Sequence, residues 1–192
     1  MLAYIEGIPV QLNPSQTYID LNGLGYEVHI TLHTYESIKG KEKVRLYTHL
    51  QIREDAWVLY GFATEKEKAA FQRLLSVSGV GAATARILLS SITADELERI
   101  IWNGEAKMLE KVKGIGAKTA QRIILELKGK IILTDPEINT TPHNTTMNDA
   151  LYALLGLGIA KPMAEAALKK AAGQDEAELS TEALIKSALK NL

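Results

Sequence analysis

The spacing of apolar residues along the chain changes near residue 63. Before this point, apolar and polar positions alternate in short runs, among them YEVHITL and KVRLYTHLQI. A period of two is typical of strands with one buried face. The expected inward positions are Tyr26, Val28, Ile30 and Leu32 in the first run and Val44, Leu46, Thr48, Leu50 and Ile52 in the second. About five or six short strands in residues 1–62, separated by turn signals such as Asn22-Gly23, predict a small barrel of the OB type.

From residue 63 onward the apolar positions recur every three or four residues, which is the period of an α-helix. Two T-x-x-E segments, Thr64 to Glu67 and Thr93 to Glu96, match the capping box. In that motif the threonine caps the helix and the glutamate side chain reaches back to the threonine backbone. We therefore expect about five short helices in residues 63–130.

Residues 134–146, TDPEINTTPHNTT, are rich in Thr, Asn and Pro and contain little that a core could bury. This composition predicts a flexible linker. Residues 147–192 then predict about three helices, with Leu151, Leu154 and Leu155 in one apolar stripe. The pattern as a whole indicates a multi-domain α+β protein with a barrel, a central helical domain and a small helical domain that docks on a partner.

Composition narrows the class of protein. The chain has 192 residues and no cysteine, which excludes disulfides, thiolate metal sites and a cysteine nucleophile and suits a reducing cytosol. No apolar run is long enough to span a membrane, and the first residues lack the pattern of a secretory signal, so we expect a cytoplasmic protein without membrane contact. More than half of the 22 Lys and Arg residues lie in residues 63–130, within the helical segment.

A Gly-apolar-Gly unit occurs twice in this basic segment, at Gly79-Val80-Gly81 and Gly114-Ile115-Gly116. In each copy a short helix precedes the unit and another helix follows it directly. Glycine permits positive φ and close approach of a ligand to the backbone, and a helix N-terminus offers unpaired N–H groups to an anion such as phosphate. The apolar middle residue is expected to anchor the turn in the core.

One such unit could equally be an ordinary glycine cap in a helical hairpin. Two copies, each with an alanine directly after the second glycine, favour phosphate binding, and Lys118 can add a charged contact in the second copy. Contacts of this kind recognise the shape of the nucleic-acid backbone and do not depend on the base sequence. Two hairpins could hold both strands of one duplex.

With the segments NGLGYEVHI, REDAWVLYGF and LLGLGIAKPMAEAAL, these tandem helix-hairpin-helix motifs make the chain resemble the RuvA family of bacterial Holliday-junction-binding proteins over essentially its whole length. The resemblance implies an OB-type β-barrel in residues 1–62, a double helix-hairpin-helix DNA-binding domain in 63–133 and a three-helix, UBA-like domain in 147–192. It also implies a homotetramer, or an octamer, that holds four-way junction DNA open. The implied protein partners are the RuvB motor hexamer and, further, the RuvC resolvase.

The resemblance also assigns site residues by position. DNA-binding positions are Gly79, Val80, Gly81, Gly114, Ile115, Gly116, Ala117 and Lys118; the acidic pin near the junction centre is Glu54 and Asp55; partner-binding positions are Leu155, Leu157 and Ile159, for which a core role is about equally expected. Many family members have a lysine after the first hairpin where this chain has Ala82-Ala83-Thr84. The first hairpin is then expected to rely on main-chain N–H groups or on Arg86.

We expect no catalysis, cofactor or metal site. The sequence contains no P-loop, no G-x-S-x-G and no H-E-x-x-H pattern. His29 and His33 are expected at a strand end, on one face, as ordinary surface histidines. The predicted function is a non-catalytic DNA-binding subunit for recombination and repair. The alternatives are a generic helix-hairpin-helix duplex-binding repair protein, a structure-selective nuclease using Glu54 and Asp55 with a metal, and a protein-interaction scaffold.

Overall fold

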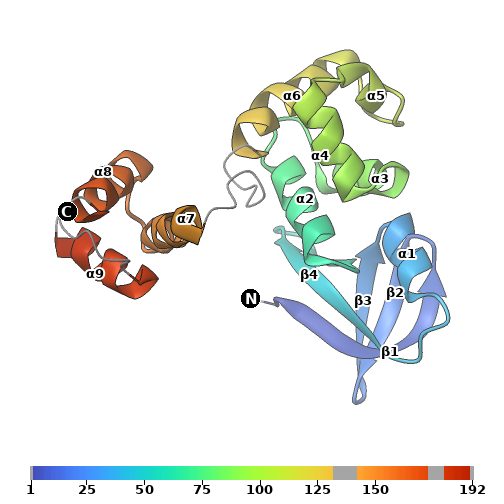
Figure 1. The fold of residues 1–192 in the computed structure, drawn as a ribbon. Helices are drawn as coiled ribbons and strands as arrows, with labels where there is room; N and C mark the ends of the chain where they lie inside the picture. The colour runs from blue at the N-terminus through green and yellow to red at the C-terminus, as the bar shows by residue number, and fades with distance from the viewer. Residues whose placement is uncertain (1, 132–141, 173–179, 191–192) are drawn as a thin grey trace. The chain divides into compact units, whose positions relative to one another are not determined.

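The computed structural model describes residues 2–131, 142–172 and 180–190 of the chain (Figure 1). These residues form two compact units, Met1–Thr134 and Asp135–Leu192, and each unit is described by itself.

The first unit opens with a closed barrel, so the expected OB-type barrel is confirmed. Its strands are β1 (Tyr4–Asn13), β2 (Gln16–Leu21), β3 (Leu24–Ile30), β4 (Val44–Ile52) and β5 (Trp57–Phe62), in the order β1-β2-β3-β5-β4. Strands β3 and β5 pair in parallel, and the other neighbours are antiparallel. Each strand thus has two neighbours, although β3 and β5 pair only at His29–Tyr60 and Ile30–Gly61. Alternate side chains fill the interior, among them Ile19, Val28, Ile30 and Leu46.

A helix that the alternating pattern does not predict, α1 (Leu32–Ile38), follows β3. Thr31 caps this helix, because its hydroxyl accepts a hydrogen bond from the Thr34 N–H at 3.0 Å. Leu32, expected on the inward face of a strand, is therefore the first residue of a helix and is 47% exposed. Ile52, expected inward at the end of the next run, is also exposed, since it is the last residue of β4.

In the described part of the first unit, five helices follow the barrel: α2 (Glu65–Leu75), α3 (Ala82–Ser91), α4 (Ala94–Asn103), α5 (Ala106–Glu110) and α6 (Ala117–Ile131). Their core is continuous with the last strand of the barrel. The Phe71 ring of α2 lies 4.9 Å from the Phe62 ring and 5.0 Å from the Tyr60 ring, centroid to centroid. Barrel and helices are thus packed on one shared cluster of apolar side chains.

The two predicted capping boxes have different outcomes. The box at Thr93 and Glu96 is confirmed, with both reciprocal hydrogen bonds present. Thr64 does cap α2, but the Glu67 side chain does not return to the Thr64 backbone. It bonds instead to threonines of the barrel, because the fold places their hydroxyl groups beside it.

The second unit contains α7 (Pro142–Gly156), α8 (Lys161–Ala172) and α9 (Thr181–Lys190), which pack around Leu154, Leu168 and Leu184. Helix α7 begins at Pro142, so the last five residues of the predicted linker 134–146 are helical. Proline in the first turn loses no hydrogen bond, and the helix then carries Met147 and Leu151 to the core. Residues 134–141 lie outside the described part of the chain. None of the described helices is long and apolar enough to cross a membrane.

Candidate nucleic-acid interface

The two Gly-apolar-Gly units adopt the same local structure. In the first turn the Val80 N–H donates to the Val77 carbonyl at 3.1 Å, and in the second the Ile115 N–H donates to the Val112 carbonyl at 3.1 Å. The first glycine of each unit has positive φ, 87° at Gly79 and 92° at Gly114. Both positions thus require the left-handed conformation that glycine adopts without steric cost.

The apolar middle residues anchor the turns. The side chains of Val80 and Ile115 are both buried in the core of the first unit. Since their N–H groups are already bonded within the turn, neither residue presents a donor to a ligand. Of the positions assigned from the sequence, the exposed ones are Gly79, Gly81, Gly114, Gly116, Ala117 and Lys118.

Unpaired N–H groups follow each turn. The Ala85 N–H bonds to the Gly81 carbonyl, and the Ala120 N–H bonds to the Gly116 carbonyl, both at 2.9 Å. The three preceding N–H groups of each helix therefore have no acceptor within the helix. Neither α3 nor α6 has an acidic residue in its first turn. The helix dipole and these donors together favour an anion at both turns.

Space and charge at the turns agree with this geometry. Apart from the adjacent residues, no described atom lies within 4 Å of the position that a side-chain Cβ would take at Gly81 or Gly116, so the backbone is open to an approaching group. Lys118, in the first turn of α6, is exposed and has no hydrogen-bond or ion-pair partner among the described residues. It can therefore contribute a free cation beside the second turn.

The two hairpins are connected by a side chain that the sequence analysis did not single out. Arg122 of α6 donates from Nη1 to the Ser78 carbonyl at 3.1 Å and to the Ser78 hydroxyl at 3.2 Å. Ser78 directly precedes Gly79, so a helix of the second hairpin holds the turn of the first. An arginine one helical turn beyond Lys118 is the only local signal for this contact.

Arg86 has a structural role in addition to any contact with a ligand. Its Nη1 donates to the Ser15 carbonyl in the β1–β2 turn at 2.6 Å. This bond ties α3 to the barrel, so one guanidinium N–H is already used. Which of the two sequence-based alternatives, main-chain N–H groups or Arg86, provides the donors at the first hairpin stays a prediction.

The two acidic residues lie together in the turn between β4 and β5. Glu54 and Asp55 are exposed, and the Arg53 N–H closes the turn on the Ala56 carbonyl at 2.9 Å. The turn follows Ile52, which pairs across the strands with Trp57, whose side chain is 75% exposed. No group of three or more metal-binding side chains occurs in the described part of the chain, here or elsewhere.

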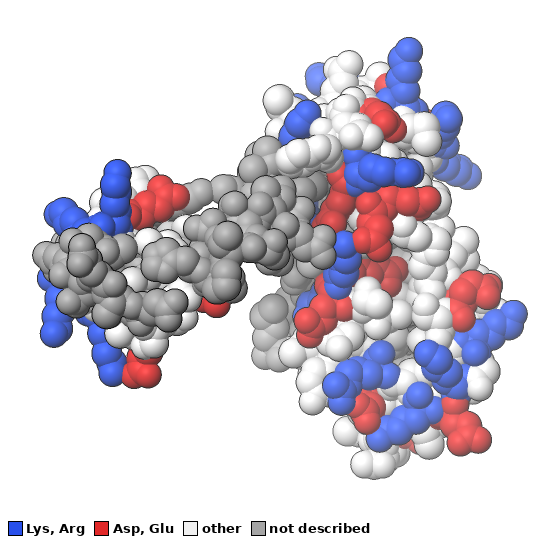
Figure 2. Space-filling model, viewed as in Figure 1, with Lys and Arg blue, Asp and Glu red and all other residues white. Residues whose placement is uncertain are grey.

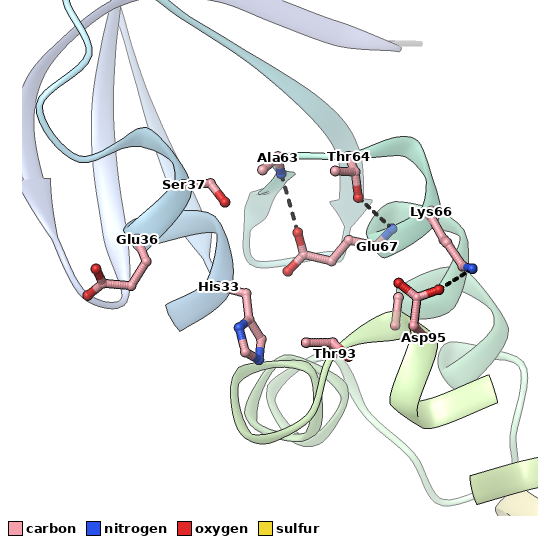
Figure 3. A pocket seen from close by; sticks show the side chains of 10 residues that line it. His33, Glu36, Ser37, Ala63, Thr64, Lys66, Glu67, Thr93 and Asp95 are labelled. Atoms are coloured by element: carbon pink, nitrogen blue, oxygen red, sulfur yellow. Dashed lines mark hydrogen bonds and ion pairs between the residues drawn. The ribbon is translucent and has the colours of Figure 1, made fainter. Parts of the chain in front are cut away.

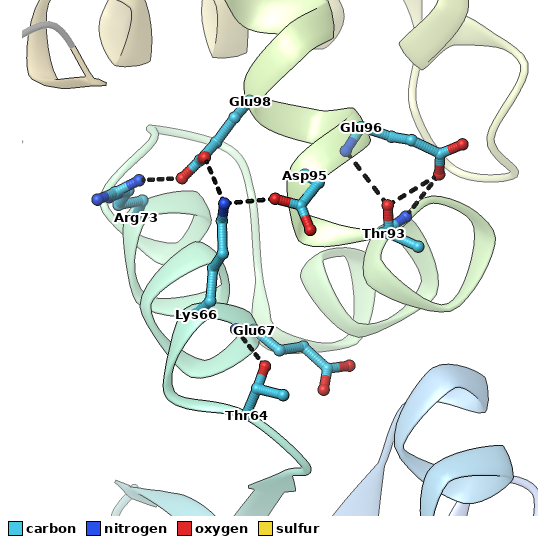
Figure 4. Close-up of polar contacts among 8 residues, drawn as sticks. All are labelled: Thr64, Lys66, Glu67, Arg73, Thr93, Asp95, Glu96 and Glu98. Atoms are coloured by element: carbon cyan, nitrogen blue, oxygen red, sulfur yellow. Dashed lines mark hydrogen bonds and ion pairs between the residues drawn. The ribbon is translucent and has the colours of Figure 1, made fainter. Parts of the chain in front are cut away.

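Much of the charge on α2 and α4 is neutralised within the protein (Figure 4). Lys66 bonds to Asp95 and lies 3.2 Å from Glu98, and Arg73 bonds to Glu98 at 2.9 Å. These bonds, the one to Asp95 first, raise the pKa of Lys66. Figure 2 accordingly shows acidic and basic side chains intermixed beside the barrel, with further basic side chains projecting from the helices drawn above.

His29 and His33 do not share a strand face, contrary to the sequence-based expectation. His29 lies in β3, whereas His33 lies in α1, because the strand ends at Ile30 and a helix begins at Leu32. Burial lowers the pKa of His29, and the nearby Arg86 lowers it further.

The three predicted partner-binding residues differ in exposure. Leu157 is 65% exposed, at the turn after α7. Leu155 and Ile159 are half-buried, and Ile159 packs against the core of the second unit. Leu157 is thus the residue of the three that is most available to a partner.

A five-stranded closed barrel joined to two matched helix-hairpin-helix turns is an architecture typical of nucleic-acid-binding proteins. The family comparisons agree: residues 1–61 match the RuvA N-terminal domain, residues 71–130 the SAM-like helix-hairpin-helix tandem, and residues 145–192 the RuvA C-terminal domain.

Full-length relatives give the same result. Proteins named Holliday junction branch migration complex subunit RuvA from Christiangramia forsetii and Flavobacterium psychrophilum are each 43% identical to this chain, with 100% of both chains covered. The protein of that name from Bacteroides fragilis is 42% identical over the same full coverage. This chain belongs to the RuvA family.

Proposed function

We propose that this protein is the Holliday-junction-binding subunit of a branch migration complex, acting in recombination and repair. The observation that carries the proposal is the pair of equivalent hairpin turns, each with an open backbone and three helix N–H groups free of intrahelical bonds. Two such turns, held together by Arg122, can contact the phosphates of both strands of a duplex arm. The names of the full-length relatives support a junction as the substrate.

The exposed carboxylates of Glu54 and Asp55 have a distinct role in this proposal. They lie on the barrel and have no cationic partner among the described residues. Carboxylates repel phosphates, so we propose that they act at the crossover, where they keep separated strands from pairing again. A homotetramer would bring four such turns to one centre, and an octamer would enclose the junction from both sides.

The second unit is proposed to recruit the motor. We propose that Leu157, with Leu155 and Ile159 supporting it, contacts the RuvB ATPase, which supplies the ATP hydrolysis for branch migration. In this scheme the chain itself is not catalytic, and the RuvC resolvase acts on the same assembled junction.

The test is a gel-shift titration at fixed salt. It compares a synthetic four-way junction with a linear duplex of the same length and sequence. Tighter binding of the junction supports the proposal, whereas equal binding leaves a generic duplex-binding repair protein. Incubation with Mg²⁺ in the same experiment addresses the nuclease alternative, since cleavage of the junction by purified protein would contradict a non-catalytic subunit. Absence of binding at low salt would leave the scaffold interpretation.

A further inference from the structure

Glu67 is the one buried charged side chain in the described part of the chain, with 7% of its surface exposed. It lies in the first turn of α2, directly after the connection from the barrel. Burying a carboxyl group is costly unless hydrogen bonds replace its water. The cap of α2 needs only the Glu67 backbone N–H, whose hydrogen bond the Thr64 side chain accepts, and not a buried Glu67 side chain. The burial of this side chain therefore requires another explanation.

The donors to Glu67 come from the barrel and from the connection. Thr31 and Thr34 each donate a hydroxyl hydrogen bond to the carboxylate, the latter at 2.8 Å. The Ala63 N–H lies 3.3 Å from the same carboxylate (Figure 3). It also lies 3.0 Å from the Thr34 hydroxyl. Thr31 is also the cap of α1, so the carboxylate is bonded to the start of the barrel helix.

A second contact holds the same end of α1 from another direction. The Leu32 N–H donates to the Ser90 hydroxyl of α3 at 3.1 Å. Helix α1 is thus bound to α2 through Glu67 and to α3 through Ser90. Of these two contacts, the one through Glu67 is buried and the one through Ser90 is exposed.

We propose that Glu67 is a positioning residue that sets the orientation of the barrel relative to the tandem hairpins, and thereby the preference for a four-way junction over a linear duplex. The acidic turn lies on the barrel and the phosphate-binding turns lie on the helices. All of them can engage one crossover only if barrel and helices keep a fixed orientation. A linear duplex needs the hairpins alone. This inference rests on the proposed function.

The first experiment measures the orientation directly, without DNA. The chain has no native cysteine, so Lys41→Cys on the barrel and Lys107→Cys on α5 place two spin labels in the full-length protein. Labelled chains are assembled with a large excess of unlabelled chain. The distribution of distances between the two spin labels of one chain is then measured by pulsed electron paramagnetic resonance. Glu67→Ala should broaden this distribution. Glu67→Gln, which keeps an acceptor and the side-chain shape, should leave it narrow, as should the control Glu65→Ala on the exposed side of the same helix turn.

The second experiment measures the dissociation constants for the junction and for the linear duplex. Glu67→Ala should lower the preference for the junction roughly tenfold, the change that corresponds to one lost buried, charge-assisted hydrogen bond. Binding of the linear duplex should stay within about twofold, because the hairpin turns do not contact Glu67. Glu67→Gln should restore most of the preference. Thr34→Val, which removes one donor, should give an intermediate loss and serves if Glu67→Ala does not fold.

The outcomes separate this inference from the proposed function. A narrow distance distribution and an unchanged preference in Glu67→Ala would overturn the positioning role. Equal weakening for both DNAs would also overturn it, since that is the result of a general loss of folded protein. If the unmodified chain does not prefer the junction, the proposed function fails and with it the link to selectivity. The distance measurement then still decides whether Glu67 sets the orientation.

Discussion

Arg122 and Ser78, 44 residues apart in the sequence, are joined by two hydrogen bonds from one guanidinium nitrogen, at 3.1 Å to the carbonyl and 3.2 Å to the hydroxyl. The contact joins α6 to the residue before the first hairpin turn. It makes the spacing of the two hairpin turns a property of one packed domain. Two turns on independent hairpins would have no such fixed spacing.

Removal of this contact should destabilise the first unit. Arg122→Ala is expected to lower the free energy of unfolding by about 1 kcal/mol, since both bonds are partly exposed to water. Urea unfolding monitored by circular dichroism measures the change. Glu126→Gln is the matched control, because its ion pair with Arg122 is long, 3.9 Å, and should contribute less than about 0.5 kcal/mol. Equal losses in the two variants would mean that the ion pair, and not the bonds to Ser78, stabilises the domain.

Two alanine substitutions in the second turn should separate backbone strain from access to the ligand. Gly114→Ala forces an L-residue to a φ of 92° and should cost about 1–2 kcal/mol of folding free energy. Gly116→Ala has negative φ and open space around the new Cβ, so stability should change little. Its methyl group would occupy the space into which a phosphate must fit, so junction binding should weaken. Unaltered binding by a stable Gly116→Ala protein would argue against backbone contact at this turn.

Lys118→Ala should weaken junction binding and make its salt dependence shallower. The slope of the logarithm of the binding constant against the logarithm of salt concentration should fall in magnitude by about one unit, as for one lost phosphate contact. Titrations at several salt concentrations measure it. Lys169→Ala, an exposed lysine of the second unit, should leave the slope unchanged. A slope that is the same for Lys118→Ala and the unmodified chain would exclude the contact.

The stability of the first unit should decrease in mild acid because of two histidines. Burial lowers the pKa of His29 and His49, and nearby cations, Arg86 and Lys68 respectively, lower each further, while Glu27 opposes the shift at His29. The unfolded chain, with an ordinary histidine pKa of about 6.5, then binds more protons than the folded chain. The stability that the two neutral histidines contribute is therefore complete above about pH 6.5. It is lost as the pH falls through the lowered pKa values of the folded chain.

The urea midpoint at about pH 7.5 should accordingly exceed that at about pH 5.5. A double substitution, His29→Gln with His49→Gln, should reduce this difference. Glu6 and Glu96, whose pKa values are lowered by hydrogen bonds from Lys43 and from the Thr93 backbone respectively, titrate below this window. A pH dependence that survives the double substitution would assign it to other groups.

Deletion of the second unit should separate DNA binding from stimulation of the motor. A chain ending at residue 134 retains the whole first unit, whereas a cut at 147 would divide α7. The shortened chain should bind the junction with the affinity of the full chain and should fail to stimulate the ATPase activity of RuvB. Leu157→Asp in the full chain tests the same role with less disruption, because the side chain is exposed. Loss of junction binding on deletion would contradict the assignment of the second unit.

Most of the features that the sequence alone predicted correctly are local ones. Alternation predicted the barrel strands, and Thr93 with Glu96 predicted a complete capping box, because the groups involved are close in the sequence. The end of the strand at Thr31 was not predicted. The alternation of apolar residues continues to Leu32, and the cap of a helix of only seven residues is a weaker signal than this alternation. At Thr64 and Glu67 the motif likewise predicted only the local contact. Thr64 caps the helix as expected, but the Glu67 side chain bonds to a threonine that is distant in the sequence.

The sequence by itself determined the two hairpin turns. Glycine at the left-handed position, an apolar anchor after it and a helix start form one local unit, and few other residues can adopt it. Only the tertiary structure decided which distant groups meet. Glu67 bonds to Thr31, 36 residues away, and Arg122 bonds to Ser78, 44 residues away, because packing of the barrel and helices on a shared core brings them together. No local pattern encodes such pairs, since each depends on the path of all the chain between them.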